Sequence, residues 1–99
     1  MDQTRLTMME AIARRRKVEA SYNATRIVLA PHLLFERHGD LFVSAVNLSK
    51  HRRKDDEQRL GQFKLAGLVA ATILDDGFEQ LSTYRPVAPR VDDKLLLTI

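Results

Sequence analysis

The stretch from residue 26 to residue 47 constrains the fold more than any other part of the chain. Its sequence, RIVLAPHLLFERHGDLFVSAVN, places two apolar arms on either side of a Gly39-Asp40 pair. Glycine tolerates the positive φ that tight hairpin connections demand. One face of both arms is apolar, and it carries Ile27, Leu29, Leu33 and Phe35, then Leu41, Val43 and Ala45. The pattern predicts an antiparallel hairpin with one buried face.

The opposite face of this hairpin mixes polar groups with an aromatic ring. His32 and Glu36 lie on the first arm, and Phe42, Ser44 and Asn47 lie on the second. His32 can bind an anion or titrate near neutral pH, or it can be a histidine at a bend that bonds to backbone. Phe42 can stack on a base, or it can pack in the core. We expect a ligand site on this face, and both alternatives stay open for each residue.

An amphipathic helix is predicted before the hairpin, over residues 4–16. Asp2 or Thr4 can cap it. Its apolar face is predicted to contain Leu6, Met9, Ile12 and Ala13. The basic residues 14–17 come at its C-terminal end, where cations suit the helix dipole. They, like the second basic cluster at residues 50–54, can also hold phosphates or be solvated surface charge.

Short strands are predicted around the hairpin, at residues 18–22, 59–65 and 68–74. Turns are expected at residues 23–24, 66–67 and 75–77, with Phe78 and Leu81 anchoring the chain to the core. Pro31 cannot donate to a ladder, so we expect a bend, a bulge or an edge position there. Closure of five short antiparallel strands buries an apolar face and removes the edges. The predicted fold is therefore mainly β, a small five-stranded antiparallel barrel with an N-terminal α-helix.

The 99 residues predict one domain over residues 1–81 and a tail over residues 82–99. Pro86 and Pro89 disfavour helix in the tail. The apolar residues 95–99 predict a last strand or an association segment.

Composition excludes several classes of protein. The absence of cysteine excludes a disulfide scaffold and thiolate metal sites. The three histidines have no metal-like spacing, and no phosphate loop or nucleophile signature occurs. We therefore expect neither an enzyme nor a bound metal or cofactor. The N-terminus lacks a signal-peptide pattern, and no apolar run approaches the ~20 residues of a membrane span. A cytoplasmic protein without membrane contact is the expectation.

The pieces of this chain, in their order, resemble a WYL domain over about residues 6–78. The resemblance rests on the basic helix end, the VEASY strand, Arg26-Ile27-Val28 leading to Pro31-His32, the GDLFV strand, and residues 59–68. Leu41-Phe42-Val43 takes the place of the family's Trp-Tyr-Leu, so the middle ring can stack but cannot donate a hydrogen bond. Gly61 and Gly67 stand where the family often has arginine.

The resemblance implies an Sm-like barrel of the Src-homology-3 type that senses a ligand in bacteria. Such domains accompany DNA-binding transcription regulators or defence proteins, and their ligands are thought to be nucleic acids or other anions. A helix-turn-helix is not expected here, since only one helix precedes the strands.

Two functions follow as hypotheses. In the first, the domain binds a nucleic acid, a nucleotide or a similar anion and passes that state to a regulator or defence partner. The candidate ligand-binding residues are His32, Phe42, Arg59, Lys64, Arg26, Arg37 and Tyr22. In the second, the domain is a self-associating module without a small ligand, which forms a homo-oligomer through an exposed strand or through the tail.

Overall fold

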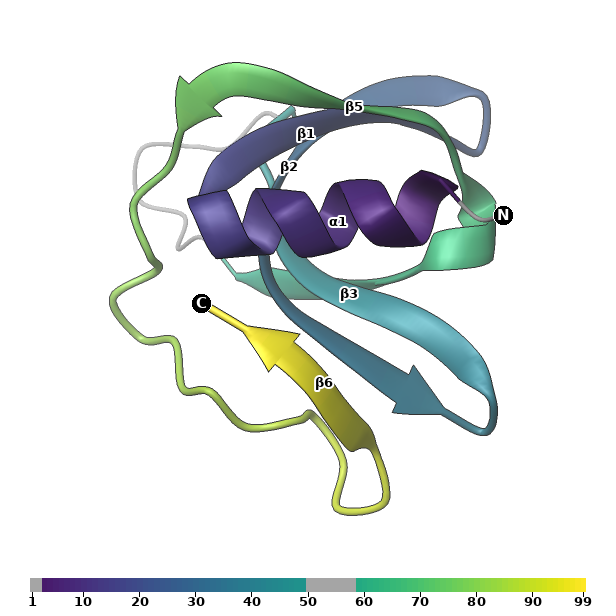
Figure 1. The fold of residues 1–99 in the computed structure, drawn as a ribbon, viewed down its shortest axis with the longest axis vertical. Coiled ribbons are helices and arrows are strands. Elements are labelled where there is room, and N and C mark those ends of the chain that lie inside the picture. Colours follow the sequence, from purple (N-terminus) through teal and green to yellow (C-terminus); the bar gives the residue numbers. More distant parts are fainter. Residues whose placement is uncertain (1–2, 50–58) are drawn as a thin grey trace.

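The computed structural model describes residues 3–49 and 59–99, and Figure 1 shows their fold. The helix α1 (Gln3–Arg14) comes first. It is followed by β1 (Arg16–Tyr22), β2 (Thr25–Arg37), β3 (Asp40–Asn47), β4 (Leu60–Lys64), the short 3₁₀ helix η1 (Leu65–Gly67), β5 (Leu68–Gly77) and β6 (Lys94–Thr98). None of the described helices is long and apolar enough to cross a membrane.

The described strands form one antiparallel sheet of six, which confirms a mainly β fold with an N-terminal helix. Five strands follow the order β4-β3-β2-β1-β5, and β6 pairs with β2. One edge of β2 pairs with β3. Its other edge is shared, because β1 pairs with the first half of β2 and β6 pairs with the second half. Strand β2 is therefore the centre of the fold.

The prediction of a closed five-stranded barrel was wrong. The sheet has a sixth strand, and β4 and β5 stand at opposite ends of the strand order, joined by η1. The helix α1 lies within the curve of the sheet (Figure 1). It buries Met8, Ala11 and Ile12 against Val18, Leu29 and other sheet residues. Because the helix supplies one side of the core, the strands do not have to close on themselves to bury their apolar face.

Two tight turns define the hairpins. Asn23 and Ala24 have φ of 51° and 64°, and His38 and Gly39 have φ of 52° and 83°. Positive φ at both central residues is the type I′ geometry that matches the twist of antiparallel strands. These two predicted turns are confirmed, with the mid-chain turn centred on His38-Gly39 while Asp40 begins β3. The expected irregularity at Pro31 is also confirmed, since the β2–β3 register shifts between Pro31 and Leu33.

Of the predicted apolar face of the helix, only Ile12 is buried, and the prediction was wrong for Leu6, Met9 and Ala13. Met8, Ala11 and Ile12 are buried, whereas Leu6 is 42% exposed and Met9 39% exposed. Positions 8, 11 and 12 satisfy the 3.6-residue period as well as the predicted set does. The helix has apolar residues on more than one side, so its docking, rather than its pattern, decides which of them are buried.

The predicted turn at residues 75–77 was also wrong, because β5 continues to Gly77. Gly77 pairs with Arg16, and the Arg16 guanidinium donates a hydrogen bond to the Asp75 carbonyl oxygen. A turn-forming composition is thus overridden by pairing with β1.

Candidate functional site

His32 is buried on β2, with 1% of its surface exposed. Its Nδ1 lies 2.8 Å from the Ala30 carbonyl oxygen, and its Nε2 lies 3.0 Å from the backbone nitrogen of Leu81. Since the Leu81 N–H can only donate, Nε2 is the acceptor and Nδ1 carries the proton. Burial lowers the pKa of His32 below its usual value, and the bond to Ala30 opposes this only partly. The ring is therefore neutral at physiological pH.

The chain from Phe78 to Ile99, which we call the C-terminal segment, covers this histidine. The rings of Phe78 and Tyr84 each lie 5.1 Å from the His32 ring. The His32 carbonyl oxygen accepts bonds from the Ile99 backbone nitrogen at 3.0 Å and from the Tyr84 hydroxyl at 3.4 Å. Of the two alternatives for His32, the structure shows a ring bonded to backbone. The predicted anchors Phe78 and Leu81 are confirmed.

A cavity of about 310 Å³ lies beside His32. Two of its lining side chains are charged, Lys17 at the start of β1 and Glu79 just after β5. The remaining lining residues are Ala30, His32, Val46, Leu48, Gly77, Phe78 and Leu81. Most of the lining residues are apolar in type, but the lining surface is about equally polar and apolar. The C-terminal segment forms one wall of the cavity.

Lys64 lines a different and smaller hollow, of about 130 Å³, next to the mid-chain turn. Its ammonium lies 3.4 Å from the Asp40 carboxylate. The two hollows share no lining residue, and Phe42 and Arg59 line neither of them. The sequence predicted that His32 and Lys64 line one site. In the described part of the chain they line two separate hollows instead. Arg59 is exposed just before β4.

Phe42 and Arg37 form a second cluster, around a buried carboxylate. The Phe42 ring stacks on Phe35 at 5.4 Å, with 11° between the ring planes. The Arg37 guanidinium carbon lies 5.1 Å from each ring centroid. Its Nε and Nη2 donate to the two oxygens of Asp93 at 2.8 Å each, and the Asp93 side chain is 0% exposed. The half-buried Phe42 ring thus supports an arginine that is already paired.

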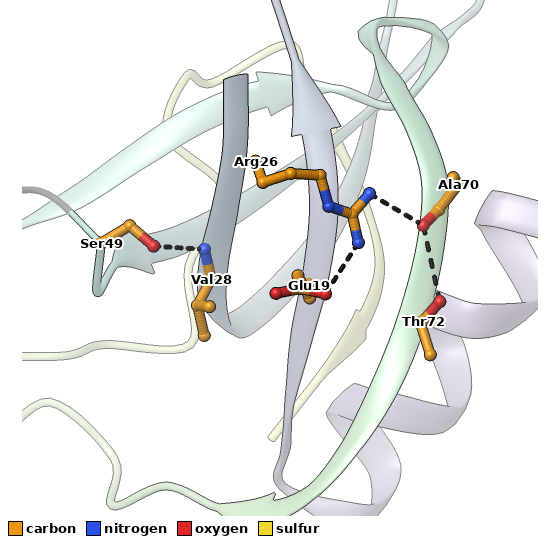
Figure 2. A network of polar contacts seen from close by, with 6 residues as sticks. All are labelled: Glu19, Arg26, Val28, Ser49, Ala70 and Thr72. Carbon is orange, nitrogen blue, oxygen red and sulfur yellow. Dashed lines mark hydrogen bonds and ion pairs between the residues drawn. The ribbon is translucent and has the colours of Figure 1, made fainter. Parts of the chain in front are cut away.

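The two remaining candidates hold the sheet together. Figure 2 shows that the Arg26 guanidinium bridges from β2 to Glu19 on β1 and to the Ala70 carbonyl oxygen on β5. The distances are 2.8 Å and 3.4 Å. The Tyr22 ring meets Phe63 edge to face, with centroids 5.4 Å apart. A Cβ on Gly67 would lie 3.0 Å from Tyr22 Cε1, so the ring uses the space that this glycine leaves.

Sequence reasoning missed Lys17, Glu79, Tyr84 and Asp93. Lys17 belongs to a basic cluster whose members look alike in sequence, and only the start of β1 directs one of them to the cavity. Asp93 meets Arg37 across 56 residues, a separation at which no local pattern indicates a pair.

The described residues contain no group of three or more histidine, cysteine, aspartate or glutamate side chains placed to hold a metal ion. Comparison of the chain with protein-family models, with curated proteins and with solved structures finds no match.

Proposed function

We propose that this domain is a small-ligand binding module and that its site is the cavity beside His32. The observation that carries the proposal is the cavity itself, at about 310 Å³. Ligand pockets span about 300–1,000 Å³, with mainly apolar walls and a few placed polar groups. This cavity has a lining surface that is about equally polar and apolar, and its side chains include one ammonium and one carboxylate.

The ligand class that fits is a small molecule with one anionic group and an apolar or aromatic part, such as a nucleotide. Lys17 would pair with the anion, and Ala30, Val46 and Phe78 would contact the apolar part. A long nucleic acid is less favoured. Three of the candidate cations, Arg26, Arg37 and Lys64, already pair with carboxylates, so they offer little free charge to a phosphate backbone.

We propose that the likeness to a WYL domain extends to function, and its support is the order of one helix followed by antiparallel strands. We propose that ligand occupancy is passed to a DNA-binding regulator or defence partner through the C-terminal segment. Support comes from the position of Phe78, Glu79 and Leu81, which line the cavity at the start of that segment.

A thermal-shift titration tests the proposal. AMP, GMP, inorganic phosphate and a short single-stranded DNA would each be added to the wild type, to Lys17→Gln and to the matched control Lys64→Gln. A ligand at 100 times its Kd stabilises the native state by about 2.7 kcal/mol. We expect a nucleotide to raise the midpoint of the wild type and of Lys64→Gln, and to lose its effect in Lys17→Gln.

Two results would contradict this assignment. One is a midpoint that no nucleotide moves. The other is a shift of equal size in Lys17→Gln and the wild type. A shift seen only with the oligonucleotide, and lost steeply with salt, would favour a nucleic-acid interface over the cavity.

Self-association is the second candidate, and one observation favours it. Leu95 and Leu96 on β6 are each 42% exposed. Exposed apolar strand residues are common association sites. Light scattering on the full chain and on a Leu95→Lys/Leu96→Lys variant tests this candidate. A dimer that becomes monomeric in the variant supports it, whereas an unchanged monomer opposes it.

A further inference from the structure

The last strand occupies a defined place along β2, which we call the β6 seat: the edge of Leu33–Glu36 together with Arg37. Leu33 pairs with Thr98, Leu34 with Leu97, Phe35 with Leu95 and Glu36 with Lys94. Arg37, just beyond this edge, takes Asp93 in a bidentate ion pair. The seat therefore recognises both an extended backbone and a carboxylate one residue before the strand.

Strand β6 is joined to the rest of the domain by a long connection. No described helix or strand lies between Gly77 and Lys94, and residues 85–92 are exposed apart from the half-buried Ala88. Figure 1 shows this connection running around the outside of the molecule before it turns into β6. Tyr84 is buried with Leu33 and Phe35, so it marks the last firm anchor before the connection.

We propose that the β6 seat also accepts β6 from a second copy of this chain, so that two chains exchange their last strands. Besides the pairing within the seat, the Ile99 N–H donates to the His32 carbonyl oxygen, and the Tyr84 and Thr98 hydroxyls share a hydrogen bond. All these partners of β6 precede the connection, so an exchanged strand would remake each of the contacts. Exchange of an identical element is therefore a low-cost route to a dimer. The main cost of exchange is the loss of tethering, because a strand joined to its own seat by a flexible connection has an effective concentration of about millimolar.

The positive charge of Arg37 in the β6 seat favours β6 of a second copy as the occupant. Arg37 has 11% of its side chain exposed, so leaving it without its carboxylate is unfavourable. A second copy brings Asp93 in the same register as the chain's own strand. A strand of another protein would need an acidic residue at the same offset from a run of aliphatic residues. The inference does not depend on ligand binding at the cavity.

Single-cysteine variants test the exchange directly, because the wild-type chain has no cysteine. Glu36 and Lys94 are register partners, and opposite residues of an antiparallel pair lie within reach of a disulfide. A Glu36→Cys chain would be mixed with a Lys94→Cys chain and oxidised mildly at increasing protein concentration. We expect a mixed disulfide dimer that grows as the concentration approaches about 1 mM.

The matched control pairs Lys94→Cys with Glu19→Cys, which places the thiol on β1 away from the seat. A Glu36→Cys/Lys94→Cys double variant checks the register, since its disulfide should form within one chain at low concentration. Asp93→Asn should speed the exchange without raising the final dimer fraction, because the closed and exchanged forms lose the same ion pair.

Three results would overturn the proposal: a mixed dimer no more abundant than the Glu19→Cys control, no mixed dimer at any concentration, or no internal disulfide in the double variant. Dimerisation by light scattering without the mixed disulfide would assign association to an exposed edge or to another surface instead.

Discussion

The backbone N–H of Leu81 donates to Nε2 of His32 at 3.0 Å, across a separation of 49 residues. This bond requires an unprotonated Nε2, and Nδ1 is already committed to the Ala30 carbonyl oxygen. A proton added to His32 would remove the acceptor for Leu81 and place a charge in a site with 1% exposure. The protonation state of one imidazole is thus tied to the attachment of the C-terminal segment.

We expect the free energy of unfolding to fall as the pH drops below about 6.5. The pKa of His32 is lowered in the native state. Between the ordinary and the lowered pKa, the unfolded chain therefore binds a proton at His32 and the native protein does not. The loss is at most about 1.4 kcal/mol per pH unit and ends at the lowered native pKa. Lys17 and Glu79, of opposite charge, line the same cavity as His32.

Urea unfolding at about pH 7.5 and about pH 5.5 measures this loss. His32→Gln removes the titrating group, and His38→Gln, at an exposed turn, is the control. The His32 variant should be less stable overall yet show a shallower pH dependence. An unchanged pH dependence in His32→Gln would refute the assignment.

Asp93→Asn is expected to lower the thermal midpoint clearly, whereas Asp92→Asn should change it little. Asp93 accepts two hydrogen bonds from Arg37 and its side chain is 0% exposed, while Asp92 is exposed. The bonds from Arg37 hold the pKa of Asp93 below its usual value. The Arg37–Asp93 pair therefore contributes its full stabilisation above the ordinary aspartate pKa. This contribution is lost as the pH falls through the lowered pKa of Asp93 in the native state. Equal midpoints for the two variants at neutral pH would contradict this.

Ile12→Ala should cost about 2–5 kcal/mol of unfolding free energy, because it empties a fully buried position between helix and sheet. Met9→Ala, one turn away and 39% exposed, should cost about 0.5 kcal/mol or less. Urea denaturation of both variants compares the two faces of α1. Similar losses would mean that the helix docks through a different face.

Ala70→Gly is expected to stabilise the protein by up to about 1 kcal/mol. Ala70 has φ of 55°, within an irregularity where the β1–β5 register shifts. Its carbonyl oxygen accepts bonds from Arg26 and Thr72 (Figure 2), so the bulge is held in place while its side chain opposes it. Ala71→Gly, without positive φ, serves as control and should destabilise. A loss of stability in both variants would show that Ala70 bears no strain.

The sequence predicts the parts of this fold that depend on neighbouring residues. The hairpin turns and the Pro31 irregularity follow from local chemistry. The open sheet and the covering of His32 depend on how α1 and the C-terminal segment dock, and no short-range pattern encodes that docking. The candidate cations can be recognised in the sequence because arginine and lysine are charged. Their carboxylate partners cannot, and Arg37 shows why, since its partner Asp93 is 56 residues away.

The contact between Gly67 and Tyr22 limits what can evolve at this corner of the sheet. Any larger residue at position 67 would bring its Cβ to 3.0 Å from the tyrosine ring. The ring would then have to shift against Phe63, which it meets edge to face. A cation at this position would therefore be gained only together with a small displacement of the Tyr22 ring.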